Sequence, residues 1–147
     1  MTKRNDVLNV AAARAAAKSL PYAGELTPQE AFEVLQQQDY VLVDVRSKAE
    51  LDLVGRISNA IHIEWAFYPG MVANTEFAKQ LQTQVDQATP IIFMCRTGGR
   101  SHNAAIVANG LGYKAYNMLE GFEGDANAEK QRTLINGWKH AGLPWSN

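Results

Sequence analysis

The side chains best suited to chemistry lie in one seven-residue run, from Cys95 to Ser101, with the sequence CRTGGRS. It follows the apolar stretch 91–94 and precedes a helix-like stretch, 101–108. A thiol on a tight, glycine-containing loop before a helix is favoured as a thiolate, because the loop amides and the helix dipole both stabilise negative charge. The run therefore predicts a loop that holds an anionic sulfur or binds an anion beside a nucleophile.

Each part of this loop has an expected role. Cys95 is the predicted nucleophile, because a reactive thiol needs cationic neighbours and two arginines, Arg96 and Arg100, follow it in the loop. The amides of residues 96–101 are expected to form an anion-binding nest, whose backbone angles Gly98 and Gly99 permit. Ser101 is expected to cap the helix and to donate its hydroxyl toward the sulfur. The predicted substrate-binding residues are Arg96, Thr97, Gly98, Gly99, Arg100 and Ser101.

The two arginines are expected to hold the oxygens of an anionic substrate, because a guanidinium fork matches an oxyanion. Arg96 is equally compatible with a solvated side chain, and Arg100 with bracing of the loop. Asp44 and Arg46, at the end of a predicted strand, are candidate supporting residues; the alternative for Asp44 is a structural pairing with an arginine. A lone cysteine is more often a small buried apolar residue, but the arginines and glycines here favour a reactive thiol.

Composition narrows the function classes. The chain has 147 residues and a net charge of −1, and it has no long basic run, so we expect no nucleic-acid partner. One cysteine cannot form an internal disulfide, which suits the cytoplasm, the expected location. No stretch is long and apolar enough for a membrane span. No Cys/His cluster has metal-ligand spacing and no nucleotide-binding glycine motif occurs, so we expect neither a metal nor a cofactor.

The order of elements predicts how the loop is positioned. Strands are expected at 40–45, 60–63, 91–94 and 113–118, with 64–74 as a loop. Helices are expected from Thr27 to about Gln37, from Ser47 to Gly55, at 75–87, after the cysteine loop to Gly110 or Gly112, and at 128–140. Such alternation favours an α/β fold with a mainly parallel sheet and helices on both faces. Ligands of such sheets bind at the carboxyl ends of strands, where Cys95 falls.

The N-terminal stretch 1–20 is rich in alanine and is expected to be a surface helix that extends a domain formed by residues 21–147. Its basic start resembles that of a signal peptide. However, polar residues interrupt any apolar core, namely Asp6, Asn9, Arg14 and Lys18.

Three blocks of the chain resemble the rhodanese-like domain family. Residues 43–63 (VDVR, then Glu50, then GRISNAIHI) are similar to its first signature. The run from Cys95 is similar to its active-site loop, with cysteine first, glycine fourth and arginine sixth. Residues 117–121 (NMLEG) and the closing Trp138 and 142–145 (GLPW) are similar to its C-terminal signature. The chain departs from the family at Arg56, usually histidine, at Phe122, usually glycine, and in a long stretch 122–136.

The resemblance implies a three-layer α/β domain and sulfur transfer through a persulfide on Cys95. A small donor such as thiosulfate supplies the sulfur, and cyanide, a thiol or a protein accepts it. The active-site loop of cysteine-dependent phosphatases of related architecture resembles the longer spacing Cys-x5-Arg, which fits a tetrahedral oxyanion. The spacing here is Cys-x4-Arg, so sulfur transfer is favoured over a phosphatase or arsenate reductase. A relay or binding module for a protein partner is the second hypothesis. His62 and His102 are assigned structural roles, because a thiolate needs no general base.

Overall fold

The computed structural model describes residues 3–37 and 39–147. Its helices are α1 (Lys3–Ala17), α2 (Pro28–Leu35), α3 (Lys48–Val54), α4 (Phe77–Gln84) and α5 (Gly99–Gly110). Its strands are β1 (Gly24–Leu26), β2 (Val41–Asp44), β3 (Ile61–His62), β4 (Ala66–Phe67), β5 (Val72–Ala73), β6 (Ile91–Met94) and β7 (Ala115–Met118).

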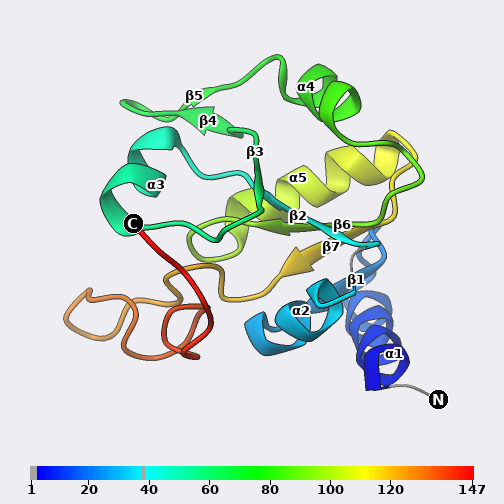
Figure 1. Ribbon diagram of the computed structural model, residues 1–147, viewed down its shortest axis with the longest axis horizontal. Helices are drawn as coiled ribbons and strands as arrows, with labels where there is room; N and C mark the ends of the chain where they lie inside the picture. Colours follow the sequence, from blue (N-terminus) through cyan, green and yellow to red (C-terminus); the bar gives the residue numbers. More distant parts are fainter. Residues whose placement is uncertain (1–2, 38) are drawn as a thin grey trace.

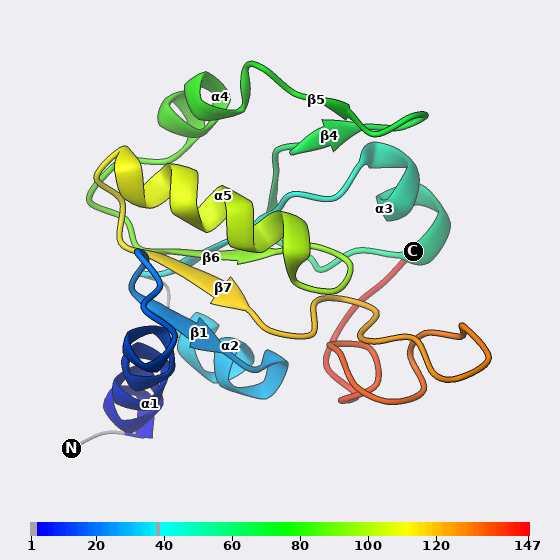
Figure 2. The same cartoon turned by 180° about the vertical axis from the view of Figure 1, so that it is seen from behind.

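The central sheet has five parallel strands in the order β1-β7-β6-β2-β3. Helices α4 and α5 cover one face, and α1 and α2 cover the other (Figure 1, Figure 2). The all-apolar β6 serves both faces, as a central strand buried on both sides must. Ile91 and Phe93 join the core under α4 and α5, while Ile92 and Met94 join the core under α1 and α2. The predicted three-layer α/β fold is confirmed.

Sheet topology explains why the site forms where it does. The chain leaves β2 through α3 toward β3 on one side, and leaves β6 through α5 toward β7 on the other. The two connections diverge at the carboxyl ends of β2 and β6, where a crevice between them is expected in such folds. Cys95 directly follows β6, so it lies at this point.

Two predicted capping boxes are present. The Thr27 hydroxyl accepts the Glu30 amide at the start of α2, and Ser47 accepts the Glu50 amide at the start of α3, each glutamate bonding back to the cap amide. Reciprocal bonds of this kind satisfy amides that a helix start leaves unpaired. Helix α3 ends at Gly55 as expected.

Three local predictions are wrong. The strand Gly24–Leu26 was not expected, because three residues that include a glycine and a glutamate carry no strand pattern; pairing with β7 forms it. The loop 64–74 contains the antiparallel hairpin β4–β5. Residues 128–140 are not helical: Lys130, Thr133 and Gly137 have positive φ, and the Asn127 side chain accepts two nearby amides, which favours turns.

The N-terminal helix is present as α1 and packs against β1 and α2, with Ala11 and Ala15 buried. An ion pair between Arg14 and Glu30 joins α1 to α2. The division of the chain at residue 20 stays a prediction. Within the described part of the chain, none of the helices combines the length and the apolar character that crossing a bilayer requires.

Candidate active site

The Cys95 side chain lies at the base of a tight loop between β6 and α5 and is 1% exposed. The Gly98 amide donates a hydrogen bond to Sγ at 3.1 Å. Gly98 has a φ of +111° and is the residue from which α5 begins, so it turns the chain and presents its amide to the sulfur. This left-handed conformation is accessible to glycine at little cost. The predicted arrangement of a thiol under a loop amide at a helix start is therefore present.

Ser101 and Asn117 complete the surroundings of the sulfur. Ser101 Oγ lies 3.4 Å from Cys95 Sγ and donates to Asn117 Oδ1 at 2.5 Å. Asn117 Nδ2 donates to the Gly98 carbonyl at 3.2 Å. The expected helix cap at Ser101 is wrong, because Ser101 lies inside the first turn of α5 and Gly98 occupies the cap position with no side-chain bond. The hydroxyl instead belongs to the sulfur's environment.

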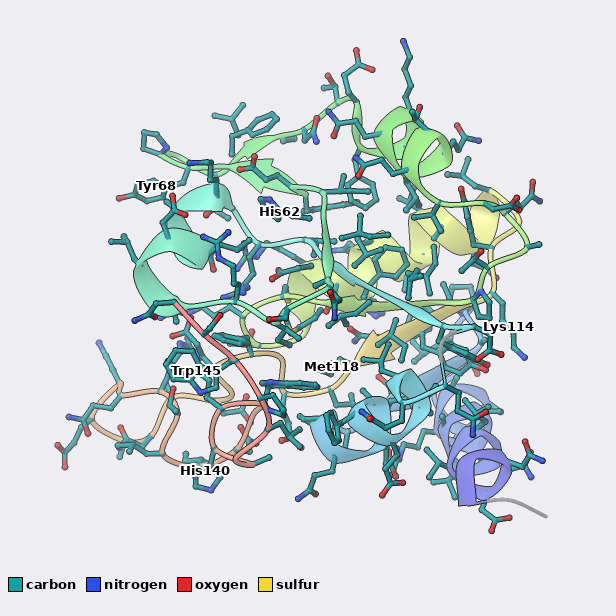
Figure 3. The ribbon with its side chains drawn as sticks, viewed as in Figure 1. His62, Tyr68, Lys114, Met118, His140 and Trp145 are labelled. Carbon is teal, nitrogen blue, oxygen red and sulfur yellow. The ribbon has the colours of Figure 1, made fainter. Side chains whose placement is uncertain are left out.

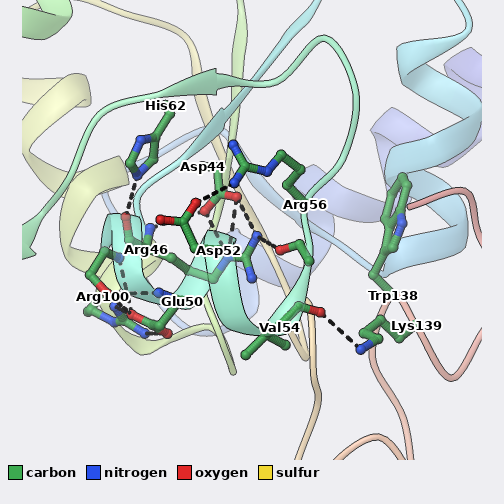
Figure 4. Close-up of polar contacts among 12 residues, drawn as sticks. Asp44, Arg46, Glu50, Asp52, Val54, Arg56, His62, Arg100, Trp138 and Lys139 are labelled. Carbon is green, nitrogen blue, oxygen red and sulfur yellow. Dashed lines mark hydrogen bonds and ion pairs between the residues drawn. The ribbon is translucent and has the colours of Figure 1, made fainter. Parts of the chain in front are cut away.

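Arg100 braces the loop and does not project freely into the site. It forms a two-point ion pair with Glu50 of α3 (Figure 4). Burial by itself would raise the pKa of Glu50, but hydrogen bonds from Arg100 and Ser47 outweigh it and lower that pKa to about 2. Of the two roles predicted for Arg100, the structure shows the bracing one. Glu50 has this second role besides its predicted cap.

Arg96 is the cation of the loop that solvent reaches. Its side chain is 46% exposed, and its Nε lies 3.3 Å from a carboxylate oxygen of Glu123. The Glu123 side chain is only 11% exposed, so the pair joins a solvent-accessible cation to a largely buried carboxylate. Arg96 therefore fits the predicted contact with an anionic donor better than Arg100 does.

The segment after β7 holds the cysteine loop through backbone hydrogen bonds. The amides of Phe122 and Glu123 donate to the carbonyls of Cys95 and Arg96 at 2.9 and 3.0 Å. Gly121 lies so close that a Cβ there would meet the Arg96 carbonyl carbon at 2.5 Å. The glycine is therefore required by contact between two backbones.

Asp44 and Arg46 form a buried ion pair at the end of β2 (Figure 4). Arg46 also donates to the Gly55 carbonyl, and its guanidinium carbon lies 4.2 Å from the centre of the Phe122 ring. Its Nη1 has no hydrogen-bond partner among the described residues, and the guanidinium as a whole lies over the ring face. The pair joins β2, α3 and the segment after β7, which is the structural pairing given as the alternative for Asp44; a supporting role for Asp44 and Arg46 in the chemistry stays a prediction.

The substrate-binding roles predicted for Thr97 and Gly99 stay predictions. Thr97 is half-buried, and Gly99 begins α5 without a positive φ, so its backbone angles do not require glycine. Away from the loop, His62 bonds the Arg46 carbonyl, and His102 shares a hydrogen bond with Tyr22. Asn117 was missed as a site residue: the sequence singles it out only as the first residue of the block 117–121, and the parallel pairing of β7 with β6 is what places it beside α5.

Other sites are less suited to chemistry. Over residues 3–37 and 39–147, no three His, Cys, Asp or Glu side chains gather closely enough to hold a metal ion. A cavity of about 710 Å³ lies between α2, the β2–β3 edge and the C-terminal segment, lined by Phe32, Tyr40, Trp138 and Trp145 among others. Its lining includes neither a charged residue nor a nucleophilic thiol, so we place the reactive centre at Cys95.

Comparison with known proteins shows what the chain is similar to. The model of the rhodanese-like domain matches residues 27–128. An uncharacterised protein of Rickettsia conorii is 34% identical over 125 residues, which are 79% of this chain and 91% of the relative. The thiosulfate sulfurtransferase GlpE of Haemophilus influenzae is 34% identical over 106 residues, covering 71% of this chain and 90% of the relative.

A solved structure has the same fold. The crystal structure of a protein from M. tuberculosis superposes with a TM-score of 0.76 at 40% identity, and the match covers 84% of this chain and 97% of that protein. The agreement extends over nearly all of the solved chain, so the fold is common to both.

Proposed function

This chain belongs to the rhodanese-like domain family, and we propose that it is a sulfurtransferase that carries sulfur as a persulfide on Cys95. The donor is a small sulfane-sulfur compound such as thiosulfate, and the acceptor is cyanide or a thiol. The observation that carries the proposal is the Cys95 sulfur at the carboxyl end of β6 with the Gly98 amide 3.1 Å away. That amide stabilises negative charge on sulfur both before and after transfer.

The proposed reaction has two steps, in each of which atoms and charge balance. The Cys95 thiolate attacks the outer sulfur of thiosulfate; a new S–S bond forms, the donor S–S bond breaks, and sulfite leaves with the bonding electrons. The product is an anionic persulfide on Cys95. Cyanide then attacks the outer sulfur, thiocyanate leaves, and the thiolate is restored. No residue must exchange a proton in either step, which fits the structural roles of His62 and His102.

The charge distribution supports sulfur transfer over phosphate chemistry. A phosphatase loop needs its arginine free to hold the phosphate oxygens through both fork nitrogens. Here both fork nitrogens of Arg100 bind Glu50. Arg96 alone of the two loop arginines is half-exposed, so it is the cation that meets the sulfonate end of the donor.

The test is the mass of the intact protein after incubation with thiosulfate and again after cyanide. Because the chain has one cysteine, a gain of one sulfur atom that cyanide removes assigns the persulfide to Cys95. Cys95→Ser is the control and is expected to gain nothing. Failure to gain sulfur from thiosulfate or from polysulfide, with Cys95 still open to alkylation, would contradict the proposal.

A protein donor or acceptor is the second candidate, favoured by exposed apolar side chains beside the site. The tip of the β4–β5 hairpin exposes Phe67, Tyr68, Met71 and Val72, and Leu53 of the neighbouring α3 is exposed as well. Figure 3 shows Tyr68 at the outer end of this hairpin. Clustered exposed apolar groups are typical of protein contacts. Replacing Tyr68 and Val72 together with serine is expected to slow transfer from a persulfidated protein and to leave thiosulfate transfer unchanged; equal effects on both would reject a protein partner at this tip.

A cytoplasmic location and the independence from metal or cofactor remain predictions from composition. Both accord with persulfide chemistry, which needs a reduced thiol and no other redox group. Fractionation of the producing cells and elemental analysis of the purified chain test them.

A further inference from the structure

Four residues form a closed ring of contacts around the reactive sulfur. The Gly98 amide donates to Cys95 Sγ, which lies 3.4 Å from Ser101 Oγ. The Ser101 hydroxyl donates to Asn117 Oδ1, and Asn117 Nδ2 donates to the Gly98 carbonyl. Cys95, Ser101 and Asn117 are at most 3% exposed. Three of the four residues are therefore buried and Gly98 is partly exposed, so each proton of the ring has few alternative partners.

The Ser101 hydroxyl has a single proton, which it donates to Asn117. Because Asn117 Nδ2 faces a carbonyl oxygen, the amide is oriented with Oδ1 toward Ser101, and an amide oxygen only accepts. At 2.5 Å the hydroxyl donates to that oxygen and turns its lone pairs to the sulfur. A neutral thiol suits this arrangement, since S–H can donate to the lone pairs. A thiolate does not suit this arrangement, since it has no proton to donate to the lone pairs of the hydroxyl.

We propose that Asn117 is a positioning residue that competes with the Cys95 sulfur for the proton of the Ser101 hydroxyl. In the resting thiol, the hydroxyl bonds Asn117. On ionisation the S–H bond breaks, its proton leaves to solvent, and the hydroxyl turns to donate to the anionic sulfur. The inference rests on the proposed function only in taking Cys95 as the reacting thiol.

Strand pairing holds the backbone of Asn117 in place, so Asn117 cannot move away from Ser101 and end the competition for the hydroxyl proton. Asn117 is paired in β7 with Glu25 of β1 on one side and Phe93 of β6 on the other. Its side chain is thereby fixed beside the first turn of α5. The Ser101 hydroxyl, in contrast, needs only a rotation about one bond to change partner.

Charged and titratable groups surround this ring, and most are paired with each other. The pairs are Arg100 with Glu50, Arg96 with Glu123, Arg46 with Asp44, Lys18 with Glu25, and Tyr22 with His102. Burial first, and then the charge of Glu25, raise the pKa of Tyr22 to about 12, while a hydrogen bond with Asn117 opposes them. Tyr22 is thus the titratable group whose electrostatics are coupled to Asn117, and Tyr22→Phe is the matched control.

The test is the pH profile of iodoacetamide alkylation, followed by intact mass on the full chain, which has one thiol. Asn117→Ala frees the hydroxyl for the thiolate, so the midpoint of the profile is expected to fall by about one pH unit. Ser101→Ala is expected to raise the midpoint. In the double variant the midpoint is expected to match that of Ser101→Ala, because Asn117 acts through the hydroxyl. Tyr22→Phe is expected to leave it unchanged.

Two results would overturn the proposal: a midpoint that does not fall in Asn117→Ala, or a fall that persists when Ser101 is alanine. If Asn117→Ala does not fold, Asn117→Val supplies the same test, because a β-branched side chain suits β7 and carries no acceptor. Alkylation reports the thiol and not the transfer of sulfur. If the alkylation midpoints do not shift as expected but the persulfide still forms, only the role of Asn117 is rejected. If the persulfide does not form, the alkylation profiles still test the role of Asn117.

Discussion

Arg100 and Glu50 form a two-point ion pair, with 2.7 Å between Nη1 and Oε1 and 2.8 Å between Nη2 and Oε2. The pair joins the first turn of α5 to the first turn of α3 across 50 positions of sequence. Glu50 simultaneously accepts the Ser47 amide that it caps. One carboxylate thus holds the start of α3 and the cysteine loop together, so the shape of the loop depends on its ionisation.

Stability is expected to depend on the ionisation of Glu50. Hydrogen bonds from Arg100 and Ser47 overcome the effect of burial and lower the pKa of Glu50 from 4.5 to about 2. A pKa lower in the folded than in the unfolded state stabilises the fold above pH 4.5, and this contribution is lost as the pH falls toward 2. Because solvent reaches the pair and screens it, the contribution is about 1–2 kcal/mol.

We therefore expect Glu50→Gln to unfold at lower urea concentration than the parent at pH 7, with a gap that narrows below pH 4.5. Urea titrations from pH 7 to pH 3 measure the gap. The exposed Glu129→Gln is the control and is expected to behave like the parent. A gap of the same size at every pH would show that Glu50 stabilises by packing and not by charge.

Short sequence patterns were enough to predict those elements of the fold that depend only on neighbouring residues. The strand Ile91–Met94 has the expected bounds, because four consecutive apolar residues before a glycine loop suit only a strand buried on both faces. The two capping boxes mark their helix starts for the same reason. In contrast, β1 exists because β7 offers it hydrogen bonds, and no window of sequence contains that information.

The site shows the same division. The cysteine, its glycines and the position at a helix start could be predicted from one run of residues. The partner of Arg100 could not, because Glu50 approaches only when α3 and α5 pack at the same end of the sheet. Asn117 was overlooked for a similar reason: its meeting with Ser101 depends on β7 lying beside β6.

Two adjacent glycines of the loop are expected to differ sharply on substitution. Gly98 has a φ of +111°, so Gly98→Ala forces a side chain into the left-handed region and is expected to cost about 1–2 kcal/mol. It also displaces the amide that bonds the sulfur, and persulfide formation is expected to slow. In Gly99→Ala the added Cβ meets nothing within 4 Å, so stability and transfer are expected to be kept. Thermal unfolding and the thiosulfate assay compare the two, and equal losses would contradict this assignment.

The buried pair of Asp44 and Arg46 is expected to be more sensitive than an exposed one. Asp44→Asn leaves the fully buried Arg46 without a counter-charge, and loss of one partner in such a pair costs about 3–5 kcal/mol. Asp52, which pairs with Arg56 at the surface, supplies the control Asp52→Asn, expected to change stability little. Chemical denaturation measures both. Similar losses in the two variants would mean that the Phe122 ring face suffices for the charge of Arg46.

Arg96 is expected to bind the donor without taking part in the bond changes. Its side chain is half-exposed and meets Glu123 through Nε at 3.3 Å, so the solvent-facing part of the guanidinium can meet a sulfonate. Arg96→Ala is expected to raise KM for thiosulfate by roughly three- to tenfold, with kcat within about twofold, because the contact is the same in the ground and transition states. Arg56→Ala removes a guanidinium of nearly equal exposure, 43% against 46%, and is expected to leave both constants unchanged. Steady-state assays over a range of thiosulfate concentrations separate the constants. A fall in kcat with constant KM would instead place Arg96 at the departing sulfite, where charge develops only during transfer.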